Sequence, residues 1–172
     1  MAYQPRDRER SEFDEQVVQI NRVSKKTKGG NKVGFSALAV VGDKKGKVGV
    51  GLGKAPDVAS AIRKGITLAK KHMITVPLTE SGSIPFRIDI KLGAAKVMLK
   101  PAPLGSGIIA GGAVRSVVSV AGIKNISSKV LGSDNKASNV HATLEALRQL
   151  GERYEHQQSV RTTKEVAEKG TK

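Results

Sequence analysis

The sequence predicts an α+β protein made of two small domains. Three observations support this: strand-like segments precede one amphipathic helix in the first half, strands and helices mix in the second half, and a polar segment at residues 79–85 separates the halves. A length of 172 residues suffices for one ordinary domain or two small ones. We therefore expect a first domain at residues 15–78 and a second at residues 86–150, with a flexible N-terminus at residues 1–14 and a tail at residues 151–172.

Three strands are expected before the first helix. An extended apolar run begins at residue 15 and gives way to a basic loop that ends in glycine, and β-branched residues then mark a strand at residues 32–42. A turn at residues 43–46 leads into a return strand at residues 47–53. Glycine at positions 49, 51 and 53 leaves one face of the return strand bare, which favours the close approach of another backbone.

One helix completes the β-β-β-α pattern of the first half. Its apolar residues recur at spacings of three or four and should lie on the sheet, and they are Val58, Ile62, Ile66, Ala69 and Met73. The second half reads β-β-α-β-α, and a short strand at residues 74–78 can precede it. The elements expected there are strands at residues 86–92, 95–100 and 123–131 and helices at residues 114–121 and 137–150.

The charge of the chain points to a polyanionic partner. Lys and Arg number 30 against 15 Asp and Glu, so the net charge is +15, and residues 22–136 alone carry 21 basic and 5 acidic side chains. Cysteine is absent, which excludes disulfides, thiol catalysis and cysteine-based zinc sites. The first twelve residues have no apolar segment, so we expect no secretory signal and a cytoplasmic location.

The scarcity of aromatic residues restricts how nucleic acid can be bound. Phenylalanine and tyrosine together make up 3% of the chain and tryptophan is absent, so stacking of single-stranded bases is not available. Phosphate contacts and recognition of folded RNA by its shape remain. We expect no membrane partner, because no helix combines a basic face with large apolar anchors.

A run of cations with no acid between them is the strongest candidate RNA site. It consists of Arg22, Lys25, Lys26, Lys28 and Lys32 around Gly29 and Gly30, and Lys44, Lys45 and Lys47 add further charge. Such a glycine-containing basic segment suits contacts with phosphates. The alternative is a merely solvated loop.

Two glycine-rich motifs allow other interpretations. The motif at residues 49–54 lacks the spacing of a nucleotide-binding loop, which favours a packing role. Gly105, Gly107 and Gly111 precede a helix and could bind an anion, so a nucleotide-binding enzyme stays an alternative, as does a nonspecific nucleic-acid chaperone. No set of histidines, carboxylates or hydroxyls suggests a catalytic or metal site, so we expect no cofactor, no small-molecule substrate and no enzyme activity.

Two stretches of the sequence closely resemble a known family. They are GFSALAVVGDKKGKVGVGLGKAPDVASAIRKGITLAKK and PAPLGSGIIAGGAVRSVVSVAGIKNISSKVLGS, and the family is the bacterial-type small-subunit ribosomal protein five. The resemblance runs from about Val17 to Leu150. It implies a first domain similar to double-stranded-RNA-binding modules and a second with a split β-α-β fold. The tail after Gly151 lacks the family's usual basic motif, so no contact of the tail is carried over.

The resemblance also implies a function. Such a protein holds ribosomal RNA near the head–body junction of the small subunit, contacts small-subunit proteins four and eight, and lies by the messenger entry channel, where it influences accuracy. Residues 25–30 correspond to the family's RNA-inserting loop, in which changes can confer spectinomycin resistance. Gly105, Gly107 and Arg115 fall in the region that contacts protein four. The full expected RNA-binding set is Arg22, Lys25, Lys26, Lys28, Gly29, Gly30, Lys32, Phe35, Lys44, Lys45, Lys47 and Lys54.

Overall fold

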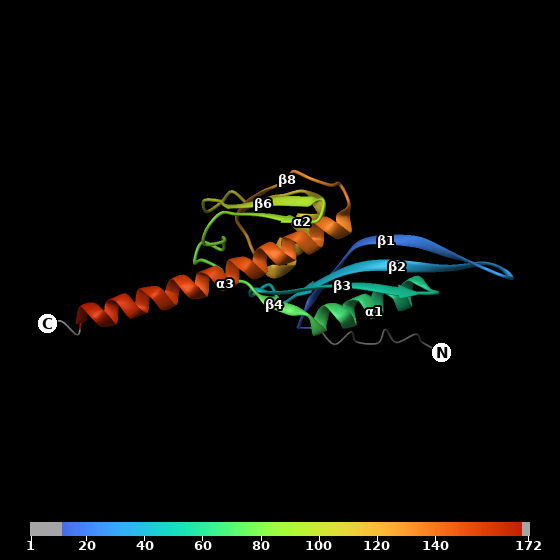
Figure 1. The fold of residues 1–172 in the computed structure, drawn as a ribbon, viewed down its shortest axis with the longest axis horizontal. Helices are drawn as coiled ribbons and strands as arrows, with labels where there is room; N and C mark the ends of the chain where they lie inside the picture. Colours follow the sequence, from blue (N-terminus) through green and yellow to red (C-terminus); the bar gives the residue numbers. More distant parts are fainter. Residues whose placement is uncertain (1–11, 170–172) are drawn as a thin grey trace, which may run out of the picture.

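The computed structural model describes residues 12–169, which form two four-stranded sheets and three helices (Figure 1). The first sheet is antiparallel, the second is mixed, and the α+β class expected from the sequence is confirmed. Most of the N-terminal segment expected to be flexible, residues 1–14, lies outside the described residues.

The first sheet has the order β1-β2-β3-β4. Its strands are β1 (Asp14–Thr27), β2 (Gly30–Gly42), β3 (Lys47–Ala55) and β4 (Met73–Thr75). The expected strands at 32–42 and 47–53 are confirmed, each slightly longer than predicted. The prediction of a basic loop before residue 32 is wrong. The β1–β2 ladder continues to the pair Thr27–Gly30, so only residues 28 and 29 form the turn.

Helix α1 (Val58–Lys71) packs on one face of this sheet. Its buried residues are Ala61, Gly65 and Ala69, spaced by four, and they lie against Gly53, Gly51 and Gly49 of β3. The apolar stripe predicted from the sequence is partly wrong, because Val58, Ile62 and Ile66 are only half-buried and Met73 lies beyond the helix in β4. The bare face of β3 was predicted correctly, and it is filled by small residues because only they allow the two backbones to come so close.

The second sheet has the order β5-β6-β8-β7. Its strands are β5 (Ile88–Leu92), β6 (Ala95–Pro101), β7 (Ile108–Ile109) and β8 (Ile126–Val130). The parallel pair β7 and β8 is connected through α2 (Gly112–Ala121), which is the expected split β-α-β arrangement. Gly122 ends α2 in the left-handed conformation with φ 88°.

A single hydrophobic core joins the two sheets. The face of the first sheet opposite α1 contributes Leu38, Val40, Val48 and Val50, and these pack with buried residues of α2, α3 and the second sheet. The segment at 79–85, expected to be a linker, is itself packed, since Ser83 and Ile84 are 3% and 1% exposed. The two sheets therefore form one packed body, and the domain boundaries inferred from the sequence stay a prediction.

Turn residues 43–46, between β2 and β3, connect the first sheet to the end of α2. The Lys44 amide donates to the carbonyl of Val120 at 3.1 Å, and the Gly46 amide donates to that of Ala121 at 3.0 Å. The Asp43 carboxylate accepts from the Lys45 and Lys47 amides at 2.7 and 2.9 Å. The turn therefore satisfies carbonyls that the last turn of α2 would otherwise leave unpaired.

Asp43→Ala is expected to lower the free energy of unfolding by about 1–2 kcal/mol, because two turn amides lose their acceptor. Burial alone would raise the pKa of Asp43, but the amide hydrogen bonds from Lys47 and Lys45 outweigh it and hold the pKa below the ordinary 3.8. A lowered carboxyl pKa stabilises the fold above the unfolded pKa. The difference between wild type and variant should therefore be complete at neutral pH and shrink as the pH falls below 3.8.

Urea unfolding at several pH values measures this difference. Asp134→Ala is the matched control, since Asp134 is exposed, and its stability should stay within about 0.5 kcal/mol of wild type. An Asp43→Ala variant as stable as this control would contradict the structural role of the turn.

Helix α3 (Lys136–Lys169) is longer than predicted, because residues 151–169 continue the helix that was expected to end at residue 150. Gly151 does not end it; this glycine is buried, with the carbonyl of Thr75 close by. Figure 1 shows the second part of α3 extending beyond the sheets. The residues that follow Gly151 are mostly polar residues with good helix propensity, which allows the helix to continue.

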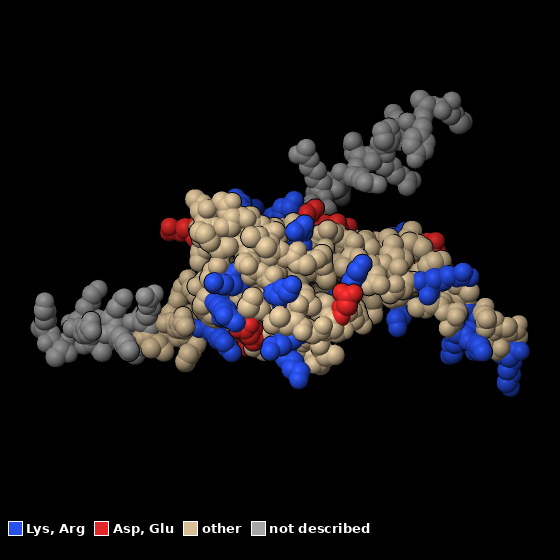
Figure 2. Space-filling model, turned by 90° about the horizontal axis from the view of Figure 1, so that it is seen from above, with Lys and Arg blue, Asp and Glu red and all other residues tan. Residues whose placement is uncertain are grey.

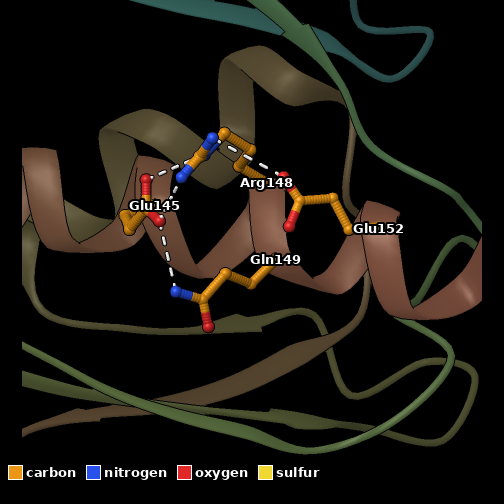
Figure 3. A network of polar contacts seen from close by, with 4 residues as sticks. All are labelled: Glu145, Arg148, Gln149 and Glu152. Carbon is orange, nitrogen blue, oxygen red and sulfur yellow. Dashed lines mark hydrogen bonds and ion pairs between the residues drawn. The ribbon is translucent and has the colours of Figure 1, made fainter.

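A polar network lies on α3 on both sides of Gly151, at residues 145–152 (Figure 3). The Arg148 guanidinium donates two hydrogen bonds to Glu145, at 2.9 and 2.7 Å, and pairs with Glu152 at 3.5 Å. Gln149 also donates to Glu145 at 3.2 Å. The Arg148 hydrogen bonds hold the pKa of Glu145 below its ordinary value. These contacts link successive turns of the helix, although exposed pairs of this kind each add little stability.

Candidate nucleic-acid interface

The β1–β2 hairpin projects from the body as a two-stranded arm. Strand β3 ends at Ala55, which pairs with Phe35, so beyond this point residues 23–27 and 30–34 pair only with each other. The six residues 22–27, at about 3.3 Å each, give an arm roughly 20 Å long. We call residues 22–35 the hairpin arm; it is the projection on the right of Figure 1.

Cations occupy both faces of the hairpin arm. Lys25 pairs directly with Lys32 on one face, while Arg22 and Lys26 alternate onto the other, and Lys28 lies in the turn. No acidic residue occurs between positions 19 and 34. Like charges directly across a strand pair are destabilising, so this arrangement is best tolerated when an anion neutralises it.

The turn of the arm depends on glycine. Gly30 has φ 133°, a conformation that other residues rarely adopt, and the Thr27 hydroxyl donates to its carbonyl at 2.7 Å. Nothing lies within 4 Å of the position that a Cβ would take on Gly29 or Gly30. The tip therefore presents a backbone that is open to a partner.

Phe35 and Lys54 lie at the root of the arm. Phe35 is partly buried and packs against the small cluster of Ala37, Ala55 and Ala61, so its ring also supports the fold. Lys54 is exposed and pairs with Ser36, on the sheet face opposite α1.

The structure does not bring Lys44, Lys45 and Lys47 to the hairpin arm. They lie at the opposite end of β2, whose 13 residues span roughly 40 Å. The Lys44 ammonium pairs with Asp14 at 3.2 Å. The expected RNA-binding set thus divides into two separate groups, and its role stays a prediction.

The residues expected to contact another protein do come together. Gly107 and Arg115 line an open cavity of about 610 Å³, together with Lys44, Ser119 and Lys124. Gly105 lies in the same loop, next to Leu104, which is 79% exposed. The lining also includes Ile108 and Ile123, and the combination of Arg115 with apolar side chains suits a protein partner.

The glycine loop before α2 uses its amides internally. Gly105 and Gly107 both donate to the side-chain oxygen of Asn125 at 3.2 Å, and Asn125 itself is 4% exposed. Sequence reasoning missed this asparagine, because no motif links it to a loop about twenty residues earlier. Since these two amides already have an acceptor, the loop is not preorganised to hold a phosphate.

Residues 12–169, the part of the chain that the structure describes, hold neither a cluster of metal ligands nor a membrane-spanning helix. Within this part, no group of three or more histidines and carboxylates is placed to hold a metal ion. Its helices include none that is both long and apolar enough to cross a membrane.

An antiparallel sheet that bears a basic arm, followed by a split β-α-β unit, is a combination found in a known protein family. The chain matches the N-terminal domain of ribosomal protein S5 over residues 13–77 and the C-terminal domain over residues 90–168. The chain belongs to the ribosomal protein S5 family, whose members are structural, non-enzymatic constituents of the small ribosomal subunit.

Curated members of this family are similar in sequence to this chain over most of its length. The small ribosomal subunit protein uS5c of Emiliania huxleyi is 55% identical over 148 residues, which cover 86% of this chain and 92% of that protein. The protein uS5 of Acaryochloris marina is 55% identical over 140 residues, 81% of this chain and 79% of that protein. The protein uS5 of Thermosynechococcus vestitus is 51% identical over 158 residues, 92% of this chain and 85% of that protein.

Proposed function

We propose that this chain is a structural constituent of the small ribosomal subunit that binds ribosomal RNA through its hairpin arm. The single observation that carries the proposal is the arm itself: five cations and no acid on a projecting two-stranded ribbon. Lysine and arginine on such a ribbon neutralise phosphates, and the wide, shallow minor groove of double-stranded RNA is accessible to a projecting ribbon. The scarcity of aromatic residues favours folded RNA over unpaired bases.

The arm is tested by removing its charge. In the arm variant, Arg22, Lys25, Lys26, Lys28 and Lys32 are all replaced by Gln, which lowers the net charge from +15 to +10. If each cation neutralises one phosphate, the slope of log affinity against log salt should fall by about 3.5–4.5. The measurement is binding of the full chain to a small-subunit ribosomal RNA transcript over a salt series.

A matched control removes the same charge elsewhere. The control variant replaces the exposed cations Arg63, Lys64, Lys71, Lys136 and Arg153 by Gln. It should retain most of the affinity of wild type. Equal losses of RNA affinity in the two variants would instead favour the alternative of a nonspecific nucleic-acid chaperone. An arm variant with unchanged RNA affinity would overturn the proposal.

The cavity beside Arg115 supports a second part of the proposal. We infer that this surface contacts a neighbouring small-subunit protein, and proteins four and eight are the expected partners. We also infer that the chain lies near the messenger entry channel and the head–body junction, where it supports the accuracy of translation. Sedimentation of a tagged Arg115→Glu chain tests the contact. Wild type should co-migrate with small subunits in moderate salt, whereas the variant should be partly released; wild type found only as free protein would refute the role.

A further inference from the structure

The outer face of the second sheet is exposed and basic. Strands β5, β6 and β8 direct Ile88, Ile90, Val97, Leu99 and Ile126 into the core, so the alternate residues point away from it. The outward residues include four exposed lysines, which we call the lysine face: Lys91, Lys96, Lys100 and Lys129. Figure 2, seen from above the second sheet of Figure 1, shows basic side chains gathered over this part of the body.

The arrangement of the lysine face concentrates its charge. Lys91 pairs directly with Lys96, and Lys129 pairs with Met98, the residue midway between Lys96 and Lys100 on β6. Four residues along a strand cover about 13 Å and three strands about 10 Å, so the four ammonium groups share a small area. The one carboxylate on these strands, Asp89, is already held by two hydrogen bonds from Arg87, at 2.9 and 3.3 Å.

The lysine face places like charges directly across from each other at the pair Lys91–Lys96, which is unfavourable for a sheet without a bound anion. Lysine ammonium groups act as point charges on flexible stems and therefore suit phosphates at variable positions. The centres of protein–protein interfaces are depleted in lysine and enriched in aromatic residues, and strands β5, β6 and β8 contain no aromatic residue. These features favour RNA over an acidic protein, and a paired RNA backbone over stacked single-stranded bases.

We propose that the lysine face is a second RNA-binding surface, separate from the hairpin arm, which takes the phosphates of a double-stranded RNA segment. The proposal rests on the RNA-binding function proposed above. The arm extends from the first sheet and the lysine face lies on the second, so one rigid chain can hold two RNA segments (Figure 1). Because both sheets share one core, the spacing between these segments would be set by the fold.

Charge removal and chemical protection test the lysine face together. The face variant replaces Lys91, Lys96, Lys100 and Lys129 by Gln, and its control replaces the exposed cations Lys64, Lys71, Lys136 and Arg153 by Gln. Binding to a small-subunit ribosomal RNA transcript should show a salt slope lower by about 3 for the face variant, with at least a tenfold loss of affinity. In the wild-type complex with RNA, the four lysines should be protected from acetylation, compared with the free chain.

The outcomes separate this proposal from the one on which it rests. A face variant that binds RNA like its control, with unprotected lysines, overturns the lysine face while leaving the arm untouched. If the arm variant also binds like wild type, the RNA-binding function itself fails. A face variant that keeps its RNA affinity but no longer enters small subunits would identify an acidic protein as the partner and overturn the RNA assignment.

Discussion

Replacing Gly51 by alanine is expected to lower the free energy of unfolding by about 3 kcal/mol or more, the upper end of what overpacking costs and a large part of the stability of an ordinary domain. A Cβ at this position would overlap the carbonyl oxygen of Gly65 and lie 2.6 Å from the amide nitrogen of Ala69. Both are backbone atoms of α1, so no side chain can rotate away to make room. The helix would have to move off the sheet, which would open the contact that Ala61 and Ala69 make with β3.

Circular dichroism during urea unfolding measures this effect. Gly29→Ala is the control: nothing lies within 4 Å of its Cβ position, so its free energy of unfolding should stay within about 0.5 kcal/mol of wild type. If Gly51→Ala were as stable as Gly29→Ala, the close packing of α1 on β3 would be wrong.

Gly122→Ala is expected to lower the free energy of unfolding by about 3 kcal/mol, because it disturbs the contact between the end of α2 and the first sheet. Its φ of 88° alone costs roughly 1–2 kcal/mol for a residue with a side chain. A Cβ would also overlap the backbone carbonyl of Lys44 and lie 2.8 Å from the Cα of Lys44. The substitution therefore pushes the 43–46 turn away from the end of α2 and removes the hydrogen bonds from Lys44 and Gly46.

Thermal unfolding of Gly122→Ala can be compared with Gly112→Ala on the same helix. Gly112 opens α2 with nothing within 4 Å of its Cβ position, so alanine there should be neutral or slightly stabilising. Equal melting temperatures for the two variants would show that the turn does not hold the sheets together.

The strands and helices of this fold were largely predictable, because their patterns are local. The strands expected at residues 86–92 and 95–100 are β5 and β6, and the glycines of β3 predicted that another backbone lies against it. The contact face of α1 was not predictable from hydrophobicity. Ala61, Gly65 and Ala69 carry less apolar surface than the larger residues beside them, and only the glycines of a different strand select them.

The candidate site was predictable in composition but less so in arrangement. The cations around Gly29 stand out in the sequence because no acid interrupts them. Their placement on a paired ribbon, and the distance that separates them from Lys44, depend on how far the β1–β2 ladder extends. The role of Asn125 depends on a tertiary contact between a loop and a residue about twenty positions away, for which a single sequence gives no signal.

The shared core has a consequence for synthesis on a translating ribosome. When the first 78 residues have left the exit tunnel, α1 can cover one face of their sheet, but Leu38, Val40, Val48 and Val50 on the other face have no cover yet. That cover comes from α2 and α3, so it arrives only after roughly seventy more residues, which is several seconds at ordinary elongation rates. During this interval the nascent chain exposes an apolar sheet next to a highly cationic arm. The order in which this protein is made therefore leaves its first sheet, with the basic arm, incompletely packed until its last helix has emerged.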